Sequence, residues 1–277
     1  MQAATPMTRR WTAPVGVLGS LLANAERRAS LLLGDEPALR ASAVSALPVP
    51  SMAAALLRST VGVIAEVKRR SPSKGEIRRG IATGQQVADY ERGGAAALSI
   101  LTEPDSFGGS PEDLVAARGG SSLPLLRKDF LVREIQLVEA RVLGASAVLL
   151  IARALPPGRL REMAVAAAEL GLETLVEVRD EREMADALSV RATMIGVNNR
   201  DLETLAIDPA TSERLIPLIP LDRIAIAESG VETRADIERF ATCGADAVLV
   251  GSSVSASPDP MSAVRALVGV RRHGRQA

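Results

Sequence analysis

The feature that most constrains the fold is a short phrase that occurs three times in the chain. GGAAALSI, LGASAVLL and CGADAVLV each join the end of a helical pattern to an apolar run, with Gly94, Gly144 and Gly244 at matching places. Glycine is favoured there because it can end a helix in the left-handed conformation. The phrases lie 50 and 100 residues apart, which fits two and four strand–helix units. The chain is therefore predicted to repeat a unit of one β-strand and one α-helix.

Apolar runs alternate with amphipathic helical patterns after residue 60. The runs lack the polar–apolar alternation of a half-exposed strand, which is expected of a parallel sheet covered on both faces. The predicted strands are residues 61–67, 96–101, 123–128, 147–151, 173–178, 194–198, 223–228 and 247–250. Eight such units favour an α/β fold of the (β/α)8 TIM-barrel type. The competitor, a doubly wound open sheet, usually carries a glycine-rich fingerprint after its first strand, where this chain reads KRRSPSKG.

The predicted barrel spans residues 61–270. Residues 1–60 are expected to form an N-terminal helical extension packed on the barrel, with a linker at 47–51, and residues 271–277 a polar C-terminal tail. Residues 8–25 superficially resemble a signal peptide, but their apolar run is short and is interrupted by proline and glycine. No apolar stretch approaches the roughly 20 residues of a membrane span. We therefore expect a cytoplasmic protein.

The composition argues against several kinds of partner. Basic and acidic residues balance at 33 each and aromatic residues make up 2%, so no surface for nucleic acid or an anionic membrane is indicated. The single cysteine, Cys243, cannot form an internal disulfide bond. No motif has the spacing of metal ligands, so no metal is expected. We expect a monomer or a weak homodimer.

Only three of the 33 basic residues are lysine: Lys68, Lys74 and Lys128. A codon usage that favours arginine would by itself leave so few lysines. Alternatively, Lys68 and Lys128 stand where a compact ammonium group is needed, whose pKa burial can lower until it releases a proton. A guanidinium group effectively never does so.

Polar side chains end several of the predicted strands. They are Glu66 and Lys68 on the first strand, Lys128 on the third, Glu177 on the fifth, Asn198 on the sixth, and Glu228 followed by Ser229 on the seventh. Any one of them alone is most simply a solvated strand end or a structural ion pair. Because the carboxyl ends of barrel strands meet at one rim, where active sites lie, together they predict an acid–base site.

The last two loops of the predicted barrel read AESGV and VLVGSS. Small residues expose backbone N–H groups, and barrels often bind phosphate after strands seven and eight. Gly230, Gly251 and Ser252 are therefore candidates for a phosphate site, with ordinary turn glycines as an equal alternative. Phe107 in the loop FGGS is a candidate apolar contact. The residues alone predict a metal-free barrel enzyme for a small phosphorylated substrate, and they do not name the reaction.

Seven segments, taken in order, resemble indole-3-glycerol phosphate synthase. They are IAEVKRRSPSKG, LTEPDSFGGSPEDL, LLRKDF, LVEV, IGVNNRDLETL, AESGV and VLVGSS, and they cover roughly residues 60–270. The resemblance implies a (β/α)8 barrel with an added N-terminal helical segment and no cofactor. It also implies a carboxy-lyase of tryptophan biosynthesis, which converts 1-(2-carboxyphenylamino)-1-deoxyribulose 5-phosphate to indole-3-glycerol phosphate with release of CO2 and water.

The resemblance further implies roles for individual residues. Lys128 resembles the general acid that protonates the substrate carbonyl, and Glu66 is placed to hold that lysine and the substrate amine. Lys68 resembles the group that meets the departing carboxylate, and Glu177 the base of the dehydration; which lysine serves which step stays open. The remaining implied contacts are Asn198, Arg200, Glu228 and Ser229 to the sugar and ring, Ser71 and Phe107 to the substrate, and Gly230, Gly251 and Ser252 to the phosphate.

The chain also departs from the pattern of the family. Residues 1–55 match it poorly, with Met52 where an aromatic residue is common, and Arg179 stands where histidine is frequent. Three alternatives stay open at this point. They are the Amadori isomerase of the same pathway, a barrel retained without catalysis, and a copy of the synthase dedicated to a specialised indole metabolite.

Overall fold

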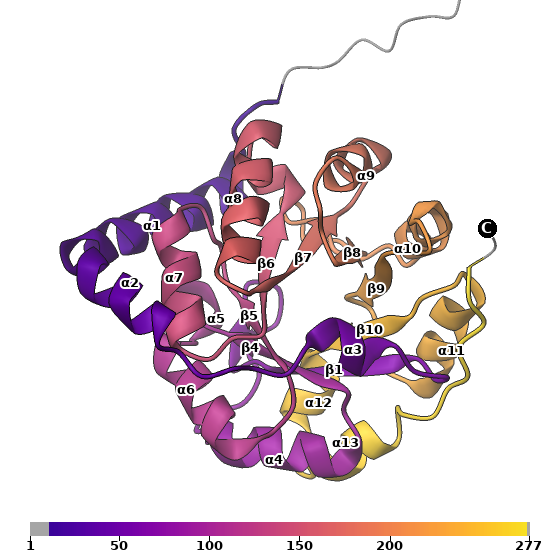
Figure 1. Ribbon diagram of the computed structural model, residues 1–277. Coiled ribbons are helices and arrows are strands. Elements are labelled where there is room, and N and C mark those ends of the chain that lie inside the picture. Colours follow the sequence, from indigo (N-terminus) through magenta and orange to yellow (C-terminus); the bar gives the residue numbers. More distant parts are fainter. Residues whose placement is uncertain (1–10, 276–277) are drawn as a thin grey trace, which may run out of the picture.

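The computed structural model describes residues 11–275, and eight parallel strands in it close into a barrel (Figure 1). Predictions for residues 1–10 and 276–277 lie outside this range. The strands are β1 (Gly62–Val67), β4 (Ala97–Leu101), β5 (Leu125–Lys128), β6 (Ala147–Ile151), β7 (Glu173–Val178), β8 (Met194–Asn198), β9 (Ile224–Glu228) and β10 (Ala247–Val250). Each pairs with its neighbours in sequence, and β1 also pairs with β10, which closes the ring. The predicted (β/α)8 fold is confirmed.

Helices follow the strands and surround the barrel. They are α4 (Thr83–Gly93), α6 (Pro111–Gly120), α7 (Glu134–Val142), α8 (Pro157–Glu169), α9 (Glu181–Leu188), α10 (Ala210–Leu215), α11 (Arg234–Thr242) and α13 (Pro260–Arg265), with the short α5 (Pro104–Phe107) and α12 (Ser252–Ala256) inside two of the loops. Gly94, Gly144 and Gly244 follow helix ends with φ of 98°, 84° and 93°. The repeated phrase therefore marks the helix-to-strand turn that its sequence predicted.

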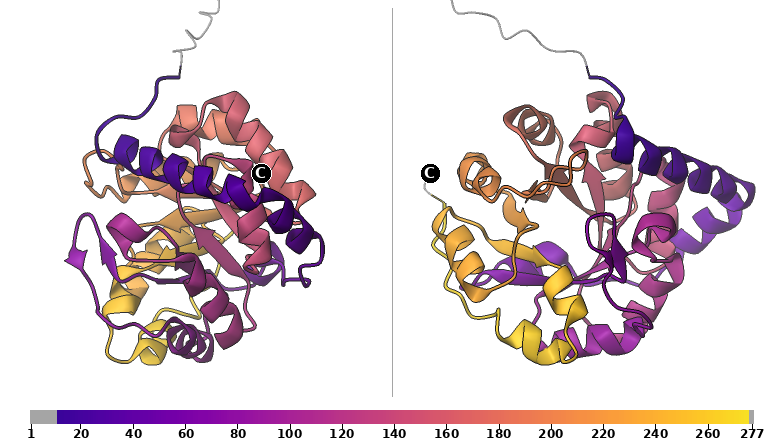
Figure 2. Two further views of the ribbon diagram at one scale, coloured as in Figure 1. Left: turned by 90° about the vertical axis from the view of Figure 1, so that its left-hand side faces the viewer. Right: turned by 180° about the vertical axis from the view of Figure 1, so that it is seen from behind.

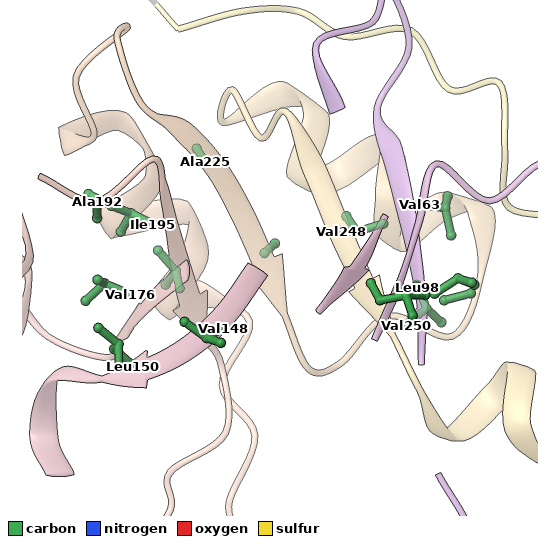
Figure 3. Close-up of a cluster of buried hydrophobic side chains, with 14 of the residues drawn as sticks. Val63, Leu98, Val148, Leu150, Val176, Ala192, Ile195, Ala225, Val248 and Val250 are labelled. Atoms are coloured by element: carbon green, nitrogen blue, oxygen red, sulfur yellow. The ribbon is translucent and has the colours of Figure 1, made fainter. Parts of the chain in front are cut away.

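The apolar core has two layers, one on each face of the sheet. Outward residues such as Val63, Val148 and Val176 pack against the helices, and Figure 3 shows several of them standing on their strands. The residues that alternate with them, such as Ile64 and Leu175, fill the lumen of the barrel. Both faces of each strand are thus buried, which explains why the strands read as continuous apolar runs.

The N-terminal extension contacts both ends of the barrel. Helix α1 (Gly16–Leu32) and helix α2 (Glu36–Val44) lie beside α7, and Figure 2 shows this indigo segment lying across the outside of the barrel. Helix α3 (Met52–Leu56) sits instead at the amino-terminal ends of the strands. There Glu173, the first residue of β7, accepts hydrogen bonds from the Ser51 hydroxyl and the Ala53 amide. Met52 and Leu56 are fully buried against the lumen residues.

Two arginines and a backbone pairing hold the C-terminal segment: Arg272 lies 3.1 Å from Asp246, and its amide donates to the Ser59 carbonyl. Arg275 pairs with the buried Asp246 at 2.6 Å and also donates to the Arg223 carbonyl. His273 is exposed. No helix in residues 11–275 is long and apolar enough to cross a membrane.

The sequence did not predict the hairpin that follows β1. Strands β2 (Arg70–Ser71) and β3 (Gly75–Glu76) pair in antiparallel fashion, with Gly75 in the left-handed region at φ 64°. The Ser71 hydroxyl accepts a hydrogen bond from the Lys74 amide inside this turn. The motif SPSKG therefore encodes a tight turn as well as charge.

Replacing Leu56 by alanine is expected to lower the free energy of unfolding by about 2–5 kcal/mol, because the buried side chain would leave a cavity under the barrel. Leu57, the next residue, is 63% exposed, and Leu57→Ala is expected to change this free energy by less than about 0.5 kcal/mol. Urea denaturation of the two variants measures both values. Equal losses would contradict the position of α3.

Candidate active site

A cavity opens at the carboxyl ends of the strands, and most of the predicted site residues line it. The predicted residues in its wall are Glu66, Lys68, Phe107, Lys128, Glu177, Asn198, Arg200, Glu228, Ser229, Gly230, Gly251 and Ser252. Among the described residues, Ser71 is the predicted one that does not line this cavity; its hydroxyl lies in the hairpin turn. The closed barrel therefore brings strand ends that are far apart in sequence around one space.

Lys128 reaches across the barrel to two buried carboxylates. Its Nζ atom lies 2.6 Å from Glu228 Oε2 and 3.1 Å from Glu177 Oε2. The two glutamates stand on β9 and β7, on either side of β8. One ammonium group thus ties together three strands that reach the cavity from different sides.

A second ion pair lies at the carboxyl end of β1. Lys68 Nζ is 2.8 Å from Glu66 Oε1, and the other oxygen of Glu66 accepts from the Ser99 hydroxyl on β4. The backbone of Glu66 is held as well, because its carbonyl accepts from the buried hydroxyls of Tyr90 and Ser255. Glu66 is therefore fixed at both its main chain and its carboxylate.

The two ion-pair clusters at the strand ends are out of balance, because they hold three glutamates and two lysines. Burial alone would raise the pKa of Glu66, but Lys68 and Lys128 hold it below its ordinary value. Burial raises the pKa of Glu228; Lys128 opposes the rise, Glu177 and Glu66 add to it, and the pKa reaches about 7. Glu228 is therefore the carboxylate of this cluster that takes up a proton near neutral pH.

The pKa of Lys128 moves in the direction opposite to that expected from burial. Burial by itself lowers it, but the attraction of Glu228, Glu177 and Glu66 outweighs burial and raises the pKa above its ordinary value. In the free protein Lys128 is therefore a firmly protonated ammonium group. Its proton becomes easier to release when its carboxylates are neutralised or drawn away.

Two glycines leave room for these carboxylates. A Cβ atom on Gly196 of β8 would lie 2.0 Å from Glu228 Oε1, and one on Gly251 would lie 2.4 Å from Glu66 Oε1 and 2.8 Å from Lys68 Nζ. Glu228 Oε1 is also buried and has no hydrogen-bond partner among the described residues. Gly196 was not predicted as a site residue, because a glycine inside an apolar strand has no chemistry of its own to reveal it.

The loops after β9 and β10 form the small-residue end of the cavity. Ser229 and Gly230 follow β9 with φ of 66° and 79°, so the backbone turns sharply just after Glu228. A left-handed serine is an uncommon conformation that functional sites often retain. Lys74, from the hairpin, lies 3.2 Å from Glu232 at the same end.

An apolar wall and one arginine complete the cavity. The rings of Phe107 and Phe130 lie 6.4 Å apart between centroids, and Leu202 and Ile207 lie in the same lining. Arg200 donates to the Leu205 carbonyl and has no carboxylate partner within residues 11–275. Phe130 was missed as a lining residue although it ends the motif KDF, two positions after Lys128.

A second hollow adjoins the first on the side of the N-terminal extension. The two share Glu177, Asn198 and Arg200, and Trp11 and Leu18 reach the second one from the extension. Arg179, where the family frequently has histidine, pairs there with Asp201 at 3.2 Å. Burial and the charge of Asp180 raise the pKa of Glu183, in the same hollow, to about 7.

A solved structure of thiamine phosphate pyrophosphorylase from Pyrococcus furiosus is similar to the chain, with a TM-score of 0.55 over 75% of this chain and 93% of that one. The two sequences are 15% identical, so this likeness concerns the fold alone.

Curated relatives are much closer in sequence. Indole-3-glycerol phosphate synthase 2 of Streptomyces coelicolor is 44% identical over 259 residues, which cover 92% of this chain and 99% of the relative. The indole-3-glycerol phosphate synthases of a Nocardioides species and of Opitutus terrae are 46% and 47% identical, over 92% and 78% of this chain and 96% and 84% of their own lengths.

The sequence model of indole-3-glycerol phosphate synthase matches residues 25–267. The match begins well before residue 60, so the similarity extends further into the N-terminal extension than the seven motifs indicated. The chain belongs to the indole-3-glycerol phosphate synthase family.

Proposed function

We propose that the cavity closes the indole ring of indole-3-glycerol phosphate by acid–base catalysis, with Lys128 as the general acid. The observation that carries this assignment is the Lys128 ammonium group held at 2.6 and 3.1 Å from two buried carboxylates in the cavity. Family membership gives the overall reaction: the chain is an enzyme, a carboxy-lyase of tryptophan biosynthesis that acts on a small phosphorylated substrate.

Ring closure needs a proton at the substrate carbonyl. The ring carbon that carries the carboxylate attacks the carbonyl carbon, a C–C bond forms, and the carbonyl oxygen takes the proton of Lys128 and becomes a hydroxyl group. A general acid lowers the barrier because it delivers a proton to the oxygen while negative charge develops there. Glu66, which bonds Lys68 and Ser99, is positioned to hold the substrate amine.

Two eliminations complete the indole. Loss of CO2 returns the electron pair of the C–C bond to the ring, and Lys68 meets the departing carboxylate. The hydroxyl group then leaves as water after it takes a proton from a lysine, assisted by the nitrogen lone pair, and Glu177 removes the proton of the neighbouring carbon so that the double bond forms. The atoms balance as one CO2 and one water released from each substrate molecule.

The other lining residues bind the substrate. Asn198, Arg200, Glu228 and Ser229 orient the sugar and the anthranilate ring, and Phe107 packs on the ring. The loops with Gly230, Gly251 and Ser252 receive the phosphate, which fits their exposed backbone N–H groups. Ser71 acts indirectly, because its hydroxyl stabilises the hairpin turn that places Lys74 in the cavity wall.

Three broader features also belong to the proposal. The balanced charge of the chain supports a protein that engages neither nucleic acid nor a membrane surface. It acts in the cytoplasm, where this biosynthesis takes place. It works as a monomer or a weak homodimer, because each barrel holds a complete set of proposed catalytic groups.

Purified protein given the carboxyphenylamino-deoxyribulose phosphate is expected to produce a rise in indole fluorescence. Lys128→Ala and Lys128→Arg are each expected to lower kcat by about 10²–10⁴-fold, because neither side chain can donate the proton. Arg161→Ala, a change at an exposed cation on α8, is the control and should retain wild-type kcat. No fluorescence rise from folded wild-type protein, or full turnover by Lys128→Arg, would contradict the proposal.

Gly196→Ala is expected to lower kcat at least tenfold while the protein stays folded, because the added methyl group displaces the Glu228 carboxylate that anchors Lys128. Gly158→Ala on α8 is the matched control, since a Cβ atom there meets nothing within 4 Å. Steady-state kinetics and circular dichroism of both variants decide the outcome. Equal kcat values for the two would exclude a tight fit of Glu228 over Gly196.

Two glutamates of the free enzyme are expected to titrate near pH 7, protonated below it and ionised above it. They are Glu228 and Glu183, whose pKa values burial raises to about 7. Carbon NMR of protein labelled at the glutamate carboxyl carbons measures this. Glu228→Gln should remove one of the two titrations near pH 7, and Glu183→Gln should remove the other. If every glutamate titrated below about pH 6, the raised pKa values of Glu228 and Glu183 would be contradicted.

A further inference from the structure

A single arginine of the N-terminal extension contacts two buried carboxylates beside the cavity. Arg28 on α1 donates through Nη2 to Asp129 Oδ1 at 2.7 Å, and its Nη1 lies 3.5 Å from Glu103 Oε1. The Glu103 and Asp129 side chains are 0% and 1% exposed. Nη1 is buried and makes no directed hydrogen bond within residues 11–275, so its contact with Glu103 is an ion pair only.

Glu103 organises the segment that carries Phe107. Its carboxylate accepts hydrogen bonds from the backbone amides of Asp105, Ser106 and Phe107, which form the first turn of α5. Because α5 has four residues, this cap satisfies most of its free N–H groups. The position of Glu103 therefore sets the position of Phe107.

Asp129 organises the second aromatic residue. It follows Lys128, accepts from the Phe130 amide at 2.8 Å, and accepts from the Thr102 hydroxyl at 2.8 Å. The position of Asp129 therefore sets both the Phe130 ring and the backbone next to Lys128. Phe107 and Phe130 line the cavity together and lie 6.4 Å apart.

Thr102, which precedes Glu103 in the chain, bonds Asp129 through its hydroxyl, and the fork of Arg28 adds a direct bridge between the two carboxylates. A guanidinium group offers several donors in one plane and can span two carboxylates, whereas an ammonium group is a single point of charge. The neighbouring Arg27 is exposed and bonds only Asn24 among the described residues. Arg28 and Arg27 thus share a helix and a charge, and only Arg28 faces the cavity wall.

We propose that Arg28 is a positioning residue that fixes the spacing of the Phe107–Phe130 wall and thereby sets the affinity for the aromatic ring of the substrate. It acts from the N-terminal extension through Glu103 and Asp129 and touches no reacting atom. This inference rests on the proposed function, because it requires that the substrate ring lie against that wall.

The test compares Arg28→Met, Arg28→Lys and Arg27→Met in steady-state kinetics with the carboxyphenylamino-deoxyribulose phosphate. Arg28→Met and Arg28→Lys are expected to raise KM about tenfold with kcat within about twofold of wild type, because the wall loosens and the proton donors stay in place. Arg27→Met is expected to leave both constants unchanged. Arg28→Lys keeps a positive charge beside the buried acids, so it decides the question if Arg28→Met does not fold.

A double-variant cycle identifies the route of the effect. If Arg28 acts through the wall, Arg28→Lys combined with Phe107→Leu should raise KM less than the product of the two single effects. Independent, multiplying effects would overturn the inference, and so would an unchanged KM or a fall in kcat alone. Turnover by the wild-type protein distinguishes failure of the proposed function from failure of this inference. If the wild type is inactive, the proposed function is wrong. If the wild type is active and the Arg28 variants have unchanged kinetic constants, only this inference is wrong.

Discussion

The attraction between the Lys128 ammonium group and the carboxylates of Glu66, Glu177 and Glu228 is the interaction on which the site depends. Three buried carboxylates would repel one another and incur a large desolvation cost without a central cation. Because these carboxylates crowd the lumen, positions beside them must be glycine, as at Gly196 in β8 and at Gly251 just after β10. Burial raises the pKa of Glu228, and although Lys128 opposes the rise, Glu177 and Glu66 add to it, so that the pKa reaches about 7.

Most of the fold could be predicted from the sequence because every strand is buried on both faces. Such strands stand out as apolar runs, and the predicted ranges agree with the observed ones within two residues at each end. The hairpin β2–β3 and the helix α5 were missed for a physical reason. Each has only two to four residues per element, and each is held by contacts with distant residues, such as the Glu103 cap on α5, rather than by local periodicity.

The candidate site could be predicted as a set of residues but not as a set of interactions. Polar groups at strand ends must meet in a closed barrel, so Glu177 and Lys128 were found together. Which carboxylate binds Lys128 depends on distances across the lumen, and the direction of its pKa depends on the sum of three charges. Gly196 was missed because its role is to leave space for the Glu228 carboxylate, and a side chain that is absent gives no signal in the sequence. Arg28 was missed because the residues that α1 contacts lie about 80 to 100 positions further along the chain.

The pairing of β1 with β10 has a consequence for how the chain is made. Residues 62–65 pair with residues 247–250, and the Val61 amide bonds the Val270 carbonyl. A ribosome that adds about 5–20 residues per second therefore leaves this edge of β1 unpaired for on the order of 10–40 seconds before β10 emerges, while the other edge can already pair with β4. The strand that is made first therefore keeps one edge unpaired until almost the whole barrel has been made.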